Sequence, residues 1–106
     1  MNNRVEAAYM GRVSALGCVL CRRIFSLYSP AELHHVAEGS GVRSNFAVAP
    51  LCPEHHRGGT GLHGLSVPVF CARYRVPWEK EEGLLVWVAE DLQRAQLGSL
   101  FPMAVA

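Results

Sequence analysis

The sequence has 106 residues, half of them hydrophobic, and a formal net charge of +1. A chain of this length suits one compact domain with a modest core, for which a bound metal would be a natural source of added stability. The longest apolar run, residues 83–89, is far too short to cross a bilayer. These properties exclude a membrane-spanning protein, and the small net charge alone does not indicate a nucleic-acid partner.

Charge is distributed unevenly along the chain. Residues 1–75 carry eight Arg against four acidic residues, whereas residues 76–106 carry two basic and five acidic residues. Nine of the ten basic residues are Arg, whose planar guanidinium binds phosphate through two hydrogen bonds. This usage is compatible with DNA binding, and it is equally expected of a GC-rich genome. Because residues 1–6 show no cleavable signal pattern, we expect a cytoplasmic protein whose cysteines stay thiols or bind metal.

The first predicted element is an amphipathic helix over residues 3–16. Apolar side chains recur there at three- and four-residue intervals, and Gly17 is the expected stop. The helix leads into Cys18–Cys21, which predicts a tight knuckle, and a loop that ends near Pro30 follows. The predicted helix is thus followed by a turn that carries two thiols.

Two short strands are predicted next, at residues 31–36 and 46–51. The glycine-containing turn between them, at residues 38–41, indicates that they form a hairpin. The following segment, residues 54–65, is expected to begin as a helix. Its four glycines favour a loop across its middle, because glycine is a poor helix former.

Two further helices are predicted within residues 66–97, the first over residues 66–74 and the second over residues 79–96. Strands followed by helices indicate an α+β fold. We expect a single domain over residues 1–106 with its motif core at residues 18–63.

The soft metal ligands are concentrated in this motif core, which holds eight of the nine Cys and His residues of the chain. The outermost are Cys18-x-x-Cys21 and, after thirty intervening residues, Cys52-x-x-His55. Two such pairs are typical of a tetrahedral zinc site, because each presents two ligands and the gap lets remote segments converge. The alternatives are that the cysteines are buried small hydrophobes, or that the first pair is a redox dithiol, although the βαβ context of such a motif is missing.

Four more histidines, His34, His35, His56 and His63, remain in the core. Adjacent residues on a strand point to opposite faces, so the first two are expected to divide the roles of ligand and base rather than share an ion. One strand histidine with two from the following segment can form a three-histidine site that is open to water or a phosphate oxygen. The alternative is a pair of partly exposed polar residues on the strand. Cys71 is expected to be a core thiol.

The Cys and His residues belong to longer sequence motifs that resemble those of a known family. They include the two zinc pairs, Ala31-Glu32-Leu33-His34-His35-Val36, Pro50-Leu51-Cys52-Pro53-Glu54-His55-His56-Arg57-Gly58-Gly59 and Leu62-His63-Gly64. Between about Tyr9 and about Tyr74 the chain resembles the HNH, or His-Me finger, endonucleases. More narrowly, it resembles the bacteriophage recombination-enhancement (Ref) nucleases, which cut DNA where a RecA filament has paired a strand with its duplex. The resemblance implies a small zinc-stabilised ββα-metal (HNH) core with a β-hairpin and flanking helices.

The resemblance also implies a role for each residue of the site. His35 corresponds to the general base that activates water, and Asn45 to the residue that braces the loop orienting this base. Arg43 and Arg57 are expected to contact flanking phosphates of the DNA. The remaining Cys and His residues are implied to hold two ions: Cys18, Cys21, Cys52 and His55 a structural zinc, and His34, His56 and His63 the catalytic metal.

The expected function is therefore that of a metal-dependent DNA endonuclease in a bacterial host cell, encoded by a phage or prophage and acting with RecA on recombination intermediates. The catalytic ion is expected to be Mg²⁺, Mn²⁺ or Zn²⁺, because imidazoles favour zinc whereas magnesium prefers oxygen ligands. One alternative is a non-catalytic zinc-stabilised module that binds DNA or a protein, which leaves the clustering of the other histidines without a reason. Another is one half of a dimeric enzyme whose acidic C-terminal helix forms the interface; the sequence leaves monomer and dimer open.

Overall fold

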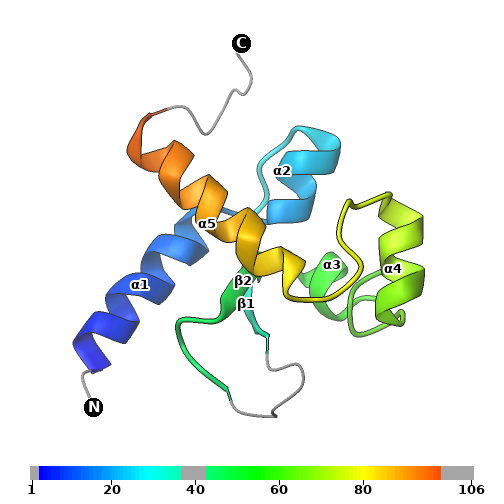
Figure 1. The fold of residues 1–106 in the computed structure, drawn as a ribbon, viewed down its shortest axis with the longest axis horizontal. Coiled ribbons are helices and arrows are strands. Elements are labelled where there is room, and N and C mark those ends of the chain that lie inside the picture. Colours follow the sequence, from blue (N-terminus) through cyan, green and yellow to red (C-terminus); the bar gives the residue numbers. More distant parts are fainter. Residues whose placement is uncertain (1–2, 37–42, 99–106) are drawn as a thin grey trace.

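The computed structural model describes residues 3–36 and 43–98, which form an α+β arrangement (Figure 1). A two-stranded antiparallel sheet lies among the helices. In the part of the chain that the structure describes, no helix is both long and apolar enough to span a membrane. In chain order the elements are α1 (Asn3–Ala15), α2 (Val19–Phe25), β1 (Glu32–His35), β2 (Val48–Leu51), α3 (Pro53–Arg57), α4 (Val67–Tyr74) and α5 (Gly83–Gln96).

The sheet is the strand pair that the sequence predicts. β1 runs antiparallel to β2 in a register that places Glu32 opposite Leu51 and His35 opposite Val48. All four residues of β2 are buried, because α1, α2 and α5 pack against this strand. The turn expected at residues 38–41 lies outside the described residues. β1 is the less covered strand, and its buried residue is His34.

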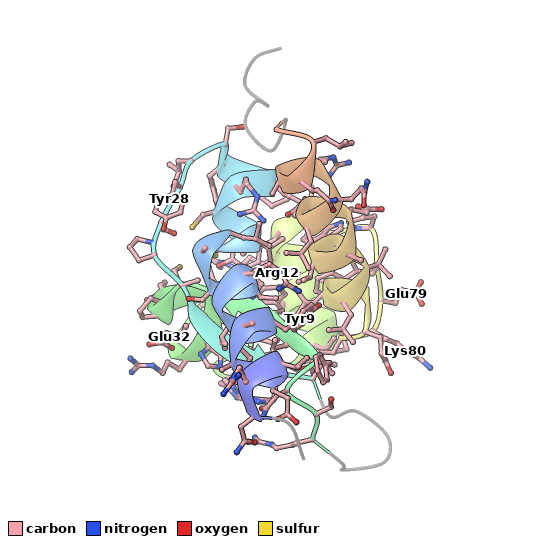
Figure 2. The ribbon with its side chains drawn as sticks, turned by 90° about the vertical axis from the view of Figure 1, so that its left-hand side faces the viewer. Tyr9, Arg12, Tyr28, Glu32, Glu79 and Lys80 are labelled. Carbon is pink, nitrogen blue, oxygen red and sulfur yellow. The ribbon has the colours of Figure 1, made fainter. Side chains whose placement is uncertain are left out.

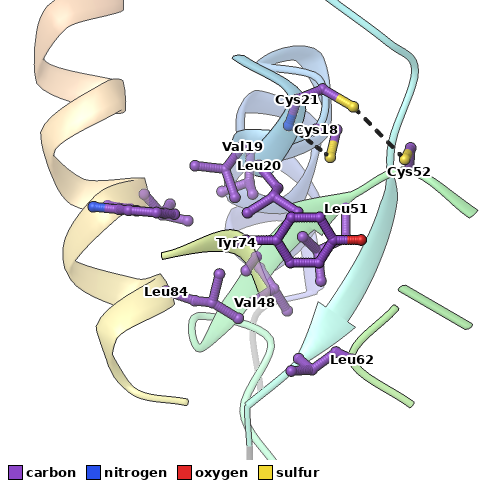
Figure 3. Close-up of a cluster of buried hydrophobic side chains, with 14 of the residues drawn as sticks. Cys18, Val19, Leu20, Cys21, Val48, Leu51, Cys52, Leu62, Tyr74 and Leu84 are labelled. Carbon is purple, nitrogen blue, oxygen red and sulfur yellow. Dashed lines mark hydrogen bonds between the residues drawn. The ribbon is translucent and has the colours of Figure 1, made fainter. Parts of the chain in front are cut away.

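The hydrophobic core lies between the sheet and the helices that pack on it (Figure 3). Three cysteines belong to the same buried cluster, and in this view they gather at one end of it, beyond Leu51 and Tyr74. These three thiols therefore lie at the margin of the core. Fully buried side chains of the core include Val13, Val19, Leu20, Val48, Leu51, Phe70, Leu84 and Val88.

α2 is a helix where the sequence predicted only a knuckle and a loop. The N–H of Cys21 donates to the sulfur of Cys18 at 3.4 Å and so caps the first turn, and Ser26 ends the helix with a left-handed φ of 57°. Arg22 of this helix is buried and forms an ion pair with Asp91 of α5. Seven residues make a marginal helix by themselves, so this long-range contact and the packing of α2 stabilise it.

α5 begins at Gly83, later than the start at residue 79 that the sequence predicted. The residues before it form a turn in which the N–H of Gly83 donates to the carbonyl oxygen of Lys80 at 2.9 Å. The indole of Trp78 packs so closely against Gly83 that a Cβ there would collide with the ring. This contact sets the direction in which the chain enters α5.

Candidate metal centres beside the hairpin

Three cysteines and one histidine converge where α2 and α3 begin. Cys18 and Cys52 are the N-cap residues of these helices, so the first turn of each helix presents one pair of candidate ligands. The Nδ1 atom of His55 lies 3.7, 3.5 and 3.3 Å from the sulfurs of Cys18, Cys21 and Cys52, and the last two sulfurs are 3.9 Å apart. A tetrahedral zinc ion with Zn–S bonds of about 2.3 Å holds its ligand atoms about 3.5–3.8 Å apart. The separations therefore fit zinc.

The chemistry of this cluster also favours a cation. All four cysteines of the chain are free thiols, and the 3.9 Å between the sulfurs of Cys21 and Cys52 far exceeds a disulfide bond of about 2.05 Å. Burial, and to a smaller extent the neighbouring thiols, raise the pKa of Cys18 to about 12. A divalent ion would offset this effect, because it binds cysteine as the thiolate. Cys71, on α4, is half-buried and outside the cluster.

Two aromatic rings hold the imidazole of His55. Phe25, the last residue of α2, stacks on it with ring centroids 5.9 Å apart and an interplanar angle of 7°. Tyr74 of α4 meets the same ring edge-on at 5.2 Å. Burial lowers the pKa of His55, which favours the neutral imidazole that binds metals. These aromatic contacts thus orient the imidazole of His55.

A second cluster, which we call the imidazole cluster, consists of His34 from β1, His56 from α3 and His63 from the loop after α3. The centroid of the His34 ring lies 5.2 Å from that of His56 and 5.3 Å from that of His63, and the latter two are 4.8 Å apart. One ligand atom of each residue lies within 4.8 Å of the others. Exposure rises from the buried His34 to the exposed His63, so the cluster opens to solvent on one side.

The glycine-rich loop brings His63 back to α3. The N–H of Leu62 donates to the carbonyl oxygen of His55, and the N–H of His63 donates to that of His56, both at 2.9 Å. The loop lies so close to the helix that a Cβ at Gly61 would collide with the α3 backbone. Glycine is therefore required at this position, and the loop packs on the helix to position the third imidazole.

Carboxylates contact two members of the imidazole cluster. Nδ1 of His56 donates to Glu32 at 2.8 Å, which leaves Nε2 of the ring available to an ion. Arg57 also binds Glu32, and hydrogen bonds from these two side chains lower the pKa of Glu32 to about 2. Nε2 of His34 contacts Glu81, yet burial dominates and lowers the pKa of His34. Carboxylate partners of this kind orient metal-binding imidazoles and set their tautomers.

His35 has different surroundings from its neighbour in β1. Its Nε2 lies 2.9 Å from the side-chain oxygen of Asn45, and the amide nitrogen of Asn45 donates to Glu6 of α1 at 2.8 Å. The adjacent His34 belongs to the imidazole cluster. The two histidines are thus divided between two environments, as strand alternation predicts.

The two arginines selected from the sequence lie at the surface, one near each set of histidines. Arg43 lines a hollow together with Glu6, Asn45 and Phe46, beside the hydrogen-bond partner of His35. Arg57 lies beside the imidazole cluster, and its exposed guanidinium is paired with a carboxylate at 2.6 Å. That carboxylate, Glu32, is at the edge of the molecule in Figure 2.

Comparison with known proteins identifies a family for this chain. The sequence matches the family described as recombination enhancement, RecA-dependent nuclease, over residues 3–93, a span that includes both ligand clusters. The chain belongs to this family. It is accordingly a nuclease, and so an enzyme. No curated protein and no solved structure matches the chain significantly.

Sequence reasoning about this RecA-dependent nuclease missed three carboxylates, Glu6, Glu32 and Glu81. For Glu32 there was a signal, because it stands two residues before His34 and hence on the same face of the strand. Glu6 lies 39 residues from Asn45, and Glu81 lies 47 residues from His34. No local pattern connects residues that far apart, so the tertiary structure was needed to find them.

Proposed function

We propose that this RecA-dependent nuclease is a metal-dependent DNA endonuclease of the HNH class. The observation that carries the proposal is the position of the histidines: β1, β2 and α3 follow one another in the chain and gather His34 with His56 and His63, while His35 stands one residue from this cluster. A strand pair followed by a helix, with ligands on both, is the arrangement expected of a ββα-metal unit. We propose that residues 1–106 form one such domain.

The proposed reaction is hydrolysis of a phosphodiester bond. Neutral His35 removes a proton from a water molecule, whose oxygen forms a bond to the scissile phosphorus. The bond from phosphorus to the 3′ oxygen breaks, and that oxygen takes up a proton from solvent, so the products carry a 5′ phosphate and a 3′ hydroxyl. Asn45 orients the imidazole of His35 for this step through their hydrogen bond.

His34, His56 and His63 are the residues that would hold the catalytic ion, Mg²⁺, Mn²⁺ or Zn²⁺. When bound, such an ion supplies positive charge that stabilises the transition state and the departing oxygen. Three protein ligands on a cluster that opens to solvent leave coordination positions for water or phosphate. The separate Cys₃His cluster would hold a structural zinc ion that joins the first turns of α2 and α3.

The substrate we propose is DNA in recombination intermediates, with the RecA filament as partner, in a bacterial cell that carries the gene on a phage or prophage. The family to which the chain belongs supports the dependence on RecA. Arg43 and Arg57 are proposed to contact phosphates on either side of the cleaved bond. For Arg57 this contact would replace part of its pairing with Glu32.

A cleavage assay tests the proposal with three DNA forms: supercoiled duplex, single strands and a joint paired by RecA. His35→Ala should lower the cleavage rate by about 10²–10⁴-fold, the usual contribution of general acid–base catalysis, while the fold and the zinc content stay unchanged. Gln93→Ala, on the exposed surface of α5, is the control and should cut like the wild type. Undiminished cutting by His35→Ala would overturn the mechanism, and wild-type binding of DNA without any cleavage would favour a non-catalytic zinc module.

A further inference from the structure

A chain of two hydrogen bonds links α1 to the hairpin. Glu6 accepts from the amide nitrogen of Asn45 at 2.8 Å, and the amide oxygen of Asn45 lies 2.9 Å from Nε2 of His35. Glu6 stands outside the Cys/His motif of the core, and its side chain is half-buried. The link therefore connects the proposed base to a helix far from it in sequence.

The direction of each hydrogen bond follows from the chemistry of the groups. An ionised carboxylate can only accept, so Glu6 must face the NH₂ group of Asn45. The amide oxygen of Asn45 then faces His35, and because this oxygen can only accept, Nε2 of His35 must carry the hydrogen. In the neutral ring the lone pair is left on Nδ1.

The turn that carries Asn45 is held in place from several sides. The ring of Tyr9 on α1 packs against that of Phe46 with centroids 5.4 Å apart. The N–H of Phe46 donates to the hydroxyl of Ser44 at 3.1 Å, and the N–H of Ala47 donates to the carbonyl oxygen of Ser44 at 3.0 Å. With the turn held in this way, a flip of the Asn45 amide is the change that would exchange its donor and acceptor, and the hydrogen bond to Glu6 opposes this flip.

We propose that Glu6 is a positioning residue of the nuclease site: through Asn45 it selects the Nε2–H tautomer of His35 and so makes Nδ1 the atom that takes the proton from water. The inference rests on the proposed function, since it assigns a role to His35 in catalysis. It adds α1 to the catalytic machinery, which the motif core alone does not include.

The test reads the tautomer directly by ¹⁵N–¹H correlation NMR of the histidine rings, with the His35 signals identified by their loss in His35→Ala. The wild-type protein should show hydrogen on Nε2 of neutral His35. In Glu6→Lys a donor replaces the acceptor, so the Asn45 amide should flip and move the hydrogen to Nδ1. The value of kcat should then fall by about 10²-fold or more, because the lone pair points away from water.

Two variants distinguish the effect of the His35 tautomer from the effect of the changed charge at position 6. Glu6→Gln removes the charge but keeps a carbonyl acceptor, so it should retain the Nε2–H tautomer and most of kcat. Glu79→Lys makes the same charge change in the exposed connection between α4 and α5, and should leave both the tautomer and kcat within twofold of the wild type.

The outcomes are distinct. Hydrogen on Nδ1 in the wild-type protein would overturn the proposal without any variant, and so would a kcat unchanged in Glu6→Lys despite a reversed tautomer. If Glu6→Lys reverses the tautomer but the wild-type enzyme cuts no DNA, the hydrogen-bond chain is correct and the proposed function fails.

Discussion

The two ligand clusters share the short helix α3 but differ in almost every other respect. His55 and His56 are adjacent on this helix, and successive helical residues differ by about 100° in direction, so their rings enter different clusters. The cluster of His55 has three buried thiols and, with the imidazole, four side chains that could bind a metal ion. The imidazole cluster has three histidines that could bind an ion, contacts carboxylates and opens to solvent at His63.

In the proposed function, this difference assigns a structural role to the thiol cluster and a catalytic role to the imidazole cluster. A closed, four-ligand site leaves no position for substrate, whereas a three-ligand site that faces water does. The buried thiols also belong to the core, so a change there alters folding. The comparison therefore predicts that losing a ligand from the first cluster affects the fold, and that losing one from the second affects metal binding and cleavage alone.

The largest effect is expected from Cys52→Ser. Structural zinc in small domains contributes about 10–16 kcal/mol of apparent binding free energy, as much as the total stability of a typical domain. The variant should lose its zinc and unfold, as measured by metal analysis and circular dichroism. Cys71→Ser, which changes a half-buried thiol outside both clusters, is the matched control and should keep its zinc and its fold. A folded, zinc-free Cys52→Ser protein would contradict a structural role.

The buried ion pair between α2 and α5 gives the next largest effect. Arg22 and Asp91 pair with side chains that are 1% and 2% exposed, so Asp91→Ala leaves a buried guanidinium without its charged partner. The same change removes the contacts of Asp91 to Arg23 and Arg94. Such a change costs about 3–5 kcal/mol, which urea denaturation would measure. The neighbouring Glu90→Ala breaks only the more exposed contact to Arg23 and should cost about 1 kcal/mol or less. Equal losses in the two variants would show that burial does not decide the strength of this contact.

His56→Ala tests the role proposed for the imidazole cluster. Removing one of three ligands should abolish binding of the second ion and reduce cleavage by more than about 100-fold, beyond the effect usual for an outer partner of a ligand. Metal analysis should find one tightly bound zinc in the variant and a second divalent ion in the wild type, while both proteins melt alike. Unfolding of His56→Ala would mean that this cluster is structural too.

The parts of the fold that follow local patterns were predictable from sequence. Two short strand-forming segments on either side of turn residues predicted both strands of the hairpin, and the spacing of Cys and His residues selected the side chains that the structure brings together in two clusters. Patterns of this kind act over a few residues, which is the range within which periodicity and ligand spacing carry information.

The features that could not be predicted depend on remote contacts. α2 is stabilised by Asp91, which lies 69 residues from Arg22, and the start of α5 depends on the packing of Trp78 against Gly83. The carboxylates beside the histidines come from distant segments in the same way. A single sequence does not show which distant side chains meet, so the two groups of Cys and His residues were predictable and two of the three carboxylates were not.

The smallest effect is expected from Glu32→Gln, which changes a hydrogen-bond partner of the imidazole cluster. Glu32 accepts a hydrogen bond from Nδ1 of His56 and orients that ring without being a ligand. Changing such an outer partner usually costs about 10–100-fold in metal affinity, so Glu32→Gln should weaken the second ion by this amount and leave the zinc of the thiol cluster unaffected. Titration with Co²⁺, followed by its visible absorption, would measure both.

Glu79→Gln is the matched control for Glu32→Gln, since Figure 2 shows Glu79 on the opposite side of the molecule from Glu32. It should bind both ions like the wild type. Arg57 also pairs with Glu32, so Arg57→Ala separates orientation from charge: it removes a cation beside the site while leaving the contact between Glu32 and His56. Affinity for the second ion should be retained in Arg57→Ala, because the carboxylate can still hold the ring. A loss as large as that in Glu32→Gln would assign the effect to the arginine pair and not to the orientation of His56.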